Sequence, residues 1–218
     1  MNLARMIDHT TLKPEASLDQ IEKLCNEGKK YGFCSICVNP VWVSYCVKTL
    51  KESGIRVCSV SGFPLGANKK ETKIKEAEMA CQEGADEVDM VMNIGALKSG
   101  DLGSVEEEIK GVRKALGGER VLKVIIETCV LTDEEKIRAA KIVMDCGADF
   151  VKTSTGFNRS GATYQDVKLL KEVVKDKIKV KASGGIRDYP TALKMIQAGA
   201  DRIGTSSGVK IIEEMKKL

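Results

Sequence analysis

The sequence predicts a single (β/α)8 barrel, the TIM-barrel architecture of the α/β class. Short β-branched runs alternate with longer charged amphipathic stretches, which is the order that a parallel sheet with crossover helices requires. Eight such repeats fit within the 218 residues, and no G-x-G-x-x-G motif marks the first turn of an open doubly wound sheet. No linker or low-complexity segment interrupts the chain, so we expect one domain spanning residues 1–218.

Eight apolar runs account for the strands of the predicted barrel. Strands that are covered by helices read as nearly continuous apolar segments. In chain order the candidates are Met6–His9, Phe33–Val38, Arg56–Ser59, Glu87–Met92, Val121–Glu127, Phe150–Thr153, Lys179–Ala182 and Arg202–Gly204.

Between these strands, apolar residues spaced three and four apart predict helices that pack one face on the sheet. The clearest are Leu18–Lys30, Lys70–Glu83, Val105–Leu116, Asp133–Asp145 and Tyr164–Val174. A Gly-Ala-Asp repeat at Gly84–Asp86, Gly147–Asp149 and Gly199–Asp201 falls each time between a helix and the next strand. Its glycine can adopt the left-handed conformation that ends a helix, so the repeat indicates recurring β/α units.

The composition favours a small anionic substrate over nucleic acid. Lys and Arg number 35 against 31 Asp and Glu, and the excess is not gathered into a basic stripe with exposed aromatics. No apolar run approaches membrane-spanning length, and Met1–Asp8 lacks the layout of a secretory signal, so we expect no membrane association and a cytoplasmic location. The eight scattered cysteines suit buried, reduced thiols.

Lysine interrupts two neighbouring strands near their C-terminal ends, where barrels of this kind build active sites. Lys152 lies in Phe150–Thr153, and Lys181 occupies the corresponding place in Lys179–Ala182. If both point inward, burial and like-charge repulsion favour a neutral amine, which can add to a carbonyl and form an iminium. The alternative is that each lysine reaches from a strand end into solvent.

A carboxylate within another strand could move the protons that Schiff-base chemistry requires. Asp89 lies inside Glu87–Met92, and it could equally be the buried ion-pair partner of a lysine. Lys123 and Glu127 share the parity of one strand face, and we interpret them as balancing charge around the site.

Two glycine-containing loops follow the last two strands, where barrels of this type commonly hold phosphate. They are Ala182–Asp188 and Gly204–Gly208, and both offer backbone N–H groups and hydroxyls. Glycine lets the backbone approach an anion closely, so this pair of loops predicts a phosphate site.

Two further motifs carry weaker signals. Cys34 and Cys37 have C-x-x-C spacing, but residues three apart in a strand point to opposite faces, and His9 is the chain's one histidine, so we expect no metal site. His9 could be a catalytic imidazole, or a structural histidine at the end of the first strand.

Five segments together resemble the deoxyribose-phosphate aldolase family over residues 6 to about 208. The K-T-S-T-G and K-A-S-G-G-I-R segments are the most specific. The segments are Asp8–Pro14, Glu87–Val91, Lys123–Thr128, Val151–Gly156 and Lys181–Arg187.

The resemblance implies a class I aldolase without metal or other cofactor, which reversibly cleaves 2-deoxy-D-ribose 5-phosphate into D-glyceraldehyde 3-phosphate and acetaldehyde in deoxyribonucleoside catabolism. It assigns the Schiff base to Lys152, assistance with proton transfer and depression of the Lys152 pKa to Lys181, and general acid/base action to Asp89. It places Asp8 and Thr10 near the sugar. It assigns phosphate contacts to Gly156, Gly184, Gly185, Gly204, Ser206 and Ser207.

The sequence departs from some family members at two places. Phe157 stands where they carry a phosphate-binding lysine, so Arg159, Arg187 or backbone groups would supply more of the charge. They also end in a tyrosine tail that aids proton transfer, whereas this sequence ends at Leu218. Two alternatives stay open, namely another Schiff-base aldolase acting on a keto-sugar phosphate and a non-catalytic barrel that binds a phosphometabolite. A homodimer or homotetramer is possible.

Overall fold

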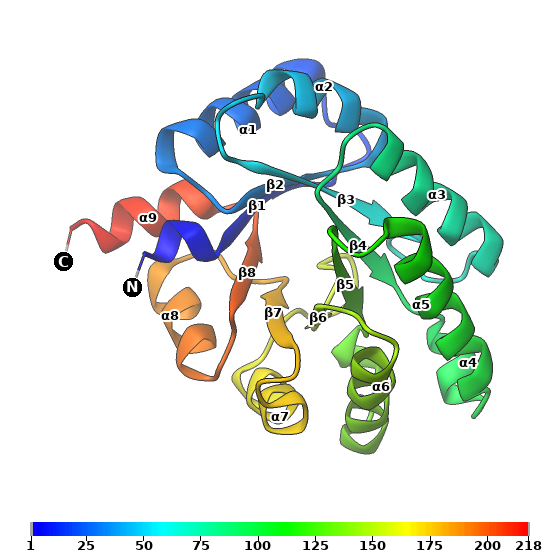
Figure 1. Cartoon of the computed structure of the whole chain (residues 1–218). Coiled ribbons are helices and arrows are strands. Elements are labelled where there is room, and N and C mark those ends of the chain that lie inside the picture. The colour runs from blue at the N-terminus through cyan, green and yellow to red at the C-terminus, as the bar shows by residue number, and fades with distance from the viewer. Residues whose placement is uncertain (1, 218) are drawn as a thin grey trace.

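The computed structural model describes residues 2–217, which form a closed barrel of eight parallel strands paired in chain order. The strands form a ring with the helices around it (Figure 1), and the last strand pairs with the first. The predicted (β/α)8 fold is therefore confirmed. The strands are β1 Ile7–Thr11, β2 Ser35–Val38, β3 Arg56–Ser61, β4 Glu87–Val91, β5 Val121–Ile125, β6 Phe150–Lys152, β7 Lys179–Ser183 and β8 Arg202–Thr205.

Nine α-helices and three short 3-10 helices connect the strands within residues 2–217. The closing helix α9 packs beside η1 and β1, so the two ends of the described chain meet on one side of the barrel (Figure 1). The α-helices are α1 Leu18–Tyr31, α2 Val43–Thr49, α3 Lys70–Gln82, α4 Ile94–Lys98, α5 Leu102–Leu116, α6 Asp133–Asp145, α7 Tyr164–Val174, α8 Tyr189–Gln197 and α9 Gly208–Met215. The 3-10 helices are η1 Leu3–Met6, η2 Pro40–Trp42 and η3 Thr128–Val130.

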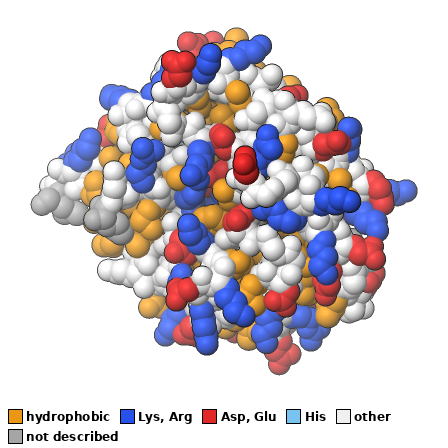
Figure 2. Space-filling view, viewed as in Figure 1, with side chains coloured by type: hydrophobic (Ala, Val, Ile, Leu, Met, Phe, Trp, Pro, Cys, Tyr) orange, Lys and Arg blue, Asp and Glu red, His pale blue; other side chains and the backbone are white. Residues whose placement is uncertain are grey.

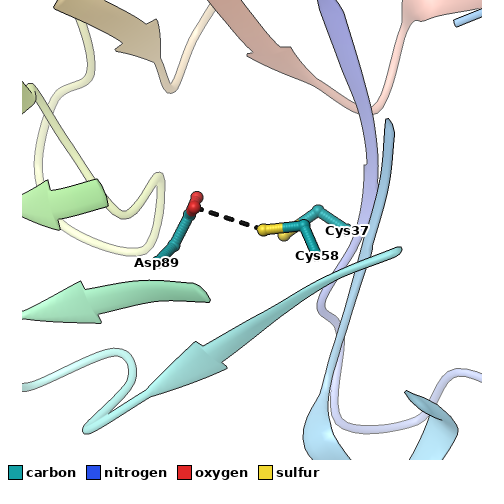
Figure 3. Close-up of side chains that lie close together, drawn as sticks. All are labelled: Cys37, Cys58 and Asp89. Atoms are coloured by element: carbon teal, nitrogen blue, oxygen red, sulfur yellow. Dashed lines mark hydrogen bonds between the residues drawn. The ribbon is translucent and has the colours of Figure 1, made fainter. Parts of the chain in front are cut away.

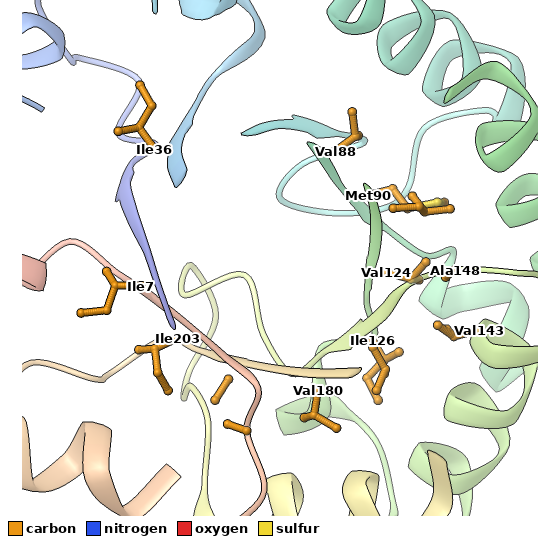
Figure 4. Close-up of a cluster of buried hydrophobic side chains, with 14 of the residues drawn as sticks. Ile7, Ile36, Val88, Met90, Val124, Ile126, Val143, Ala148, Val180 and Ile203 are labelled. Carbon is orange, nitrogen blue, oxygen red and sulfur yellow. The ribbon is translucent and has the colours of Figure 1, made fainter. Parts of the chain in front are cut away.

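Alternation along each strand separates an apolar exterior from a polar interior. Side chains such as Ile36, Val88, Val124 and Val180 are fully buried and point from the strands towards the helices (Figure 4). Because successive strand residues face opposite sides, their neighbours point into the barrel. This alternation carries the charged residues of the strands inward.

The Gly-Ala-Asp repeat closes the N-terminal end of the barrel. Its glycines take the left-handed conformation, with φ of 101° at Gly84 and 108° at Gly199, as predicted for helix ends. Each aspartate also accepts the backbone N–H at the start of the preceding strand, as Asp86 does from Val57 at 2.8 Å and Asp201 from Val180 at 2.9 Å. The repeat therefore ties each helix end to a neighbouring strand.

Some predicted strand ends were wrong. β1 and β3 continue two residues further than predicted, to Thr11 and Ser61, whereas β5 stops at Ile125. Glu127 adopts a left-handed conformation with φ of 54°, which ends the extended backbone before that residue.

Opposite charges alternate on the face seen in Figure 2, where lysines and arginines lie among aspartates and glutamates. This distribution agrees with the sequence expectation that the positive excess is spread out. Within residues 2–217 no helix is both long and apolar enough to cross a membrane.

Candidate active site

Lys152 and Lys181 meet at one carboxylate oxygen inside the barrel. They are register partners on β6 and β7, and each Nζ lies 2.7 Å from Oδ2 of Asp89. Asp89 comes from β4, and its Oδ1 accepts from Lys123 Nζ at 2.7 Å. Three strands thus direct two candidate catalytic lysines and the candidate acid/base to one point, as the sequence predicted.

A second layer of charges lies beneath this point. Asp8 Oδ2 forms an ion pair with Lys181 at 2.5 Å and Oδ1 accepts from Arg202 at 2.6 Å, while Glu87 lies 2.5 Å from Lys123. The buried part of the connected network holds four basic and three acidic side chains, namely Lys123, Lys152, Lys181, Arg202, Asp8, Glu87 and Asp89. The half-exposed Arg56 adjoins it, 3.1 Å from Glu87. With every group ionised this buried part carries one excess positive charge, which the loss of one proton would remove.

The network fixes the charge of Asp89 and Lys181. Burial alone would raise the pKa of Asp89, but the three ammonium groups around it outweigh burial and hold that pKa well below its usual range. Burial alone would lower the pKa of Lys181, but the carboxylates of Asp8 and Asp89 raise it. Lys181 therefore stays protonated, so at this lysine the carboxylates outweigh the burial and like-charge repulsion that were expected from the sequence to favour a neutral amine.

A cavity of about 630 Å³ opens at the C-terminal end of the strands, and Lys152 lies in its wall. Lys181 and Asp89 are not among its lining residues and are at most 1% exposed. Lys152 is thus the member of the pair that an entering carbonyl compound can reach. This difference in access separates two lysines that the sequence could not rank.

Most of the predicted substrate contacts line this cavity. Those at its wall are Thr10, Gly156, Gly184, Gly185, Gly204 and Ser206. Asp8 is not at the wall, because it is fully buried beneath the lysines. Ser207 is also absent from the wall, and its backbone N–H donates to Thr205 at 2.9 Å.

Glycine is required where the phosphate loops turn and cross. Gly184 and Gly185 have φ of 84° and 78°, which side chains rarely adopt. A Cβ on Gly184 would lie 2.8 Å from the backbone of Gly161, which crosses over it. Gly204 faces inward, where a Cβ would lie 3.0 Å from Lys181, so this glycine also makes room for the lysine.

Cationic side chains surround the mouth of the cavity. Arg187 lies in its wall together with Lys13 and Lys23, which sequence reasoning missed. Arg159 instead donates to the backbone oxygen of Cys129 at 3.0 Å and does not line the cavity. Lys13 could have been found because it follows β1, whereas nothing in the sequence marks Lys23, which projects from helix α1.

An apolar cluster lies next to the charged network inside the barrel. It contains Leu12, Cys37, Cys58 and Val60, with Phe63 packed against it. Leu12 and Phe157 line the cavity, and the Phe157 ring meets Phe63 edge-on at 5.2 Å. An uncharged wall therefore borders the charged network.

Two thiols of this cluster approach the central carboxylate. In Figure 3, Cys37 and Cys58 lie side by side, and the Cys58 thiol donates to Asp89 at 3.2 Å. The sulfur atoms of Cys37 and Cys58 and a carboxylate oxygen of Asp89 all lie within 4.8 Å of one another, a spacing that could suit a metal ion. The carboxylate already accepts from three ammonium groups, however, so added positive charge is disfavoured, and we assign no metal to the cluster.

Glu127 does not join the charge network, which corrects its predicted role. Its carboxylate instead accepts from the Thr155 hydroxyl at 2.5 Å and from the Thr155 backbone N–H at 3.2 Å. The residue therefore holds the loop after β6, which contributes Gly156 and Phe157 to the cavity.

Known proteins give an independent comparison. The family described as DeoC/LacD family aldolase matches residues 3–214. A deoxyribose-phosphate aldolase from Caldanaerobacter subterraneus subsp. tengcongensis is 56% identical over 100% of this chain and 95% of its own length. Another from Caldicellulosiruptor saccharolyticus is 58% identical over 97% of each chain.

A solved structure agrees with this relationship. It is described as a tetrameric deoxyribose phosphate aldolase from Aeropyrum pernix and superimposes with a TM-score of 0.92. Its sequence is 37% identical, and the match covers 98% of this chain and 91% of that one. On the family match, the curated relatives and the barrel, this chain belongs to the DeoC/LacD family of aldolases.

Proposed function

We propose that this chain is a class I aldolase that reversibly cleaves 2-deoxy-D-ribose 5-phosphate to D-glyceraldehyde 3-phosphate and acetaldehyde, with Lys152 as the Schiff-base lysine. The position of Lys152 supports this assignment most strongly. It lies in the cavity wall while sharing one carboxylate oxygen with a buried, protonated lysine. The names of the curated relatives favour this reaction over cleavage of a keto-sugar phosphate.

The first steps make the iminium. The neutral amine of Lys152 adds to the C1 carbonyl of the open-chain sugar, and the carbinolamine loses water when its oxygen is protonated. Lys181, which stays protonated, is placed to deliver that proton directly or through water, and the ionised Asp89 is placed to relay it. Asp89 Oδ2 lies 2.7 Å from both Lys152 and Lys181. The neutral form of one amine also removes the excess positive charge of the buried part of the network.

Bond cleavage then uses the iminium as an electron sink, so the proposed reaction needs no cofactor. A base removes the C3 hydroxyl proton, the C2–C3 bond breaks, and its electron pair moves through C2 to the iminium nitrogen. Glyceraldehyde 3-phosphate leaves and an enamine remains. Protonation of the enamine at C2 and hydrolysis release acetaldehyde and restore Lys152. We assign these proton transfers to Asp89 working through water.

The phosphate of the substrate belongs at the loops after β6, β7 and β8. Gly184 and Gly185 expose backbone N–H groups there, and Arg187 and Ser206 add a cation and a hydroxyl in the same wall. With Phe157 in place of a basic residue, Arg187 and the exposed lysines Lys13 and Lys23 supply the positive charge.

Exchange of the acetaldehyde methyl protons in deuterated water tests this scheme without C–C cleavage, because only the enamine takes up deuterium at that carbon. Wild type should exchange, and Lys152→Met should not. Asp89→Asn should slow exchange by about a hundredfold or more, a typical contribution of general acid/base catalysis. Exchange that persists in Lys152→Met would overturn the assignment, and wild type that neither exchanges nor releases acetaldehyde would favour a binding protein.

The cellular setting is part of the same proposal. All eight cysteines are free thiols, which supports a reducing cytoplasmic location. A homodimer or homotetramer is supported by the tetramer described for the Aeropyrum pernix protein, and by Val41 and Leu65, which are 78% and 74% exposed. Light scattering on a sizing column would give the assembly.

A further inference from the structure

The one histidine of the chain lies outside the lysine network but at the same cavity. His9 follows Asp8 on β1 and faces helix α1, where its Nε2 lies 2.7 Å from the Glu27 carboxylate. The imidazole is 3% exposed, and its ring packs on Phe33 with centroids 4.8 Å apart. A buried imidazole with one fixed carboxylate partner has a defined orientation.

The opposite nitrogen of the ring faces the start of helix α9. Because Nε2 donates to Glu27, the neutral ring presents a bare Nδ1, which has no hydrogen-bond partner among residues 2–217. A Cβ on Gly208, the first residue of α9, would lie 2.9 Å from this nitrogen. Burial lowers the pKa of His9 despite the opposing effect of Glu27, so the ring is neutral near pH 7. A neutral ring suits the positive end of a helix.

His9 also supports the loops that form the proposed phosphate site. It is the register partner of Thr205 on β8. The Thr205 hydroxyl donates to the Ile186 backbone oxygen at 2.6 Å and accepts from the Ser207 N–H at 2.9 Å. Thr205 thus joins the loop after β7 to the loop after β8, and His9 packs at the base of both.

We propose that His9 and Glu27 form a positioning pair that holds the start of α9 and the loop Thr205–Gly208 in the geometry that binds the substrate phosphate. The pair contacts no reacting atom. Glu27 also lies 3.8 Å from Lys23, another residue of the cavity wall, so the same carboxylate orients a cation at the mouth. The proposal rests on the placement of the phosphate at these loops.

The test compares cleavage of deoxyribose 5-phosphate with cleavage of unphosphorylated deoxyribose. His9→Leu removes the hydrogen bond to Glu27 and should raise KM for the phosphorylated sugar about tenfold, as expected for a lost hydrogen bond to a charged group. The kinetics with the unphosphorylated sugar should stay within about twofold. His9→Gln can still donate to Glu27 and should recover much of the loss, and Glu27→Gln should fall between the two.

Tyr31→Phe is the matched control. Tyr31 also links α1 to α9, by donating to Glu213 at 2.7 Å, but it does not line the cavity. The proposal is overturned if His9→Leu and Glu27→Gln affect both sugars equally, lower only kcat, or are reproduced by Tyr31→Phe. If wild type itself does not prefer the phosphorylated sugar, the phosphate placement fails, whatever the histidine variants do.

Discussion

The Nζ atoms of Lys152 and Lys181 lie at equal distances of 2.7 Å from one oxygen of Asp89. The two lysines differ in their other contacts. Lys181 also binds Asp8 and stays charged, whereas Lys152 lies in the cavity wall. A fixed positive charge therefore stands beside an accessible amine, an arrangement that suits Schiff-base formation.

Arg187 should contribute to affinity for the phosphorylated substrate. Its side chain lines the cavity beside Gly185, and a lost charge-assisted contact typically costs about 1.5–3 kcal/mol. Arg187→Met should therefore raise KM for deoxyribose 5-phosphate about tenfold or more, with a smaller effect on unphosphorylated deoxyribose. Arg159→Met is the control, because Arg159 is held by the Cys129 backbone oxygen. An equal effect of the two variants would contradict the assignment.

The buried ion pair between Lys73 of α3 and Glu108 of α5 should affect stability in two different ways. Removing one partner should destabilise the fold, whereas replacing both partners should not. Lys73 donates to Glu108 at 2.6 Å and to the Val91 backbone oxygen at 2.9 Å. Burial lowers the pKa of Lys73 and raises that of Glu108. Lys73→Met leaves a buried carboxylate unpaired and should lower the free energy of unfolding by about 3–5 kcal/mol.

The double variant Lys73→Met/Glu108→Gln should regain most of that stability. The amide can still accept from the Asn93 backbone N–H, as Glu108 does, without leaving a buried charge. Urea unfolding of the single and double variants measures the difference. A double variant as unstable as Lys73→Met would show that the pair itself stabilises the fold.

Asp8 should make stability depend on pH in acid. Burial would raise its pKa, but Lys181, Lys123 and Arg202 lower it far below the ordinary value of 3.8. The resulting stabilisation is complete above pH 3.8 and is lost as pH falls from there towards the native pKa, because only the unfolded state takes up the proton. Asp8→Asn should be less stable at neutral pH.

The difference in unfolding free energy between wild type and Asp8→Asn should also become smaller below about pH 4, by up to about 1.4 kcal/mol per pH unit. Unfolding free energies measured between about pH 3 and pH 6 would show it. Parallel curves for the two proteins would mean that Asp8 is not held ionised by its cationic neighbours.

The sequence was sufficient for the barrel and for the pairing of its lysines. Strand parity placed Lys152 and Lys181 at corresponding positions, and the register confirms this. The inward direction predicted for the Glu127 side chain from strand parity was wrong. The left-handed conformation of this residue ends the alternation of side chains between the two strand faces. Backbone conformation at one residue is not visible in a pattern of apolar side chains.

Contacts between distant elements were harder to predict. Lys23 reaches the cavity from a helix surface where most lysines are solvated. Asp8 lies beneath the site because β1 continues beyond the predicted end at His9 to Thr11. Depth within the barrel depends on the stagger of the strands, which local sequence does not encode. The catalytic roles of the residues that do meet remain predictions.

Borohydride trapping tests the central proposal most directly. Incubation with acetaldehyde and borohydride, followed by intact mass and peptide mapping, reports which lysine forms the iminium. We expect a reduced two-carbon adduct on Lys152 in wild type and in Lys181→Ala, and none in Lys152→Ala. An adduct that maps to Lys181, or wild type that forms no adduct while folded, would contradict the assignment of Lys152 as the Schiff-base lysine.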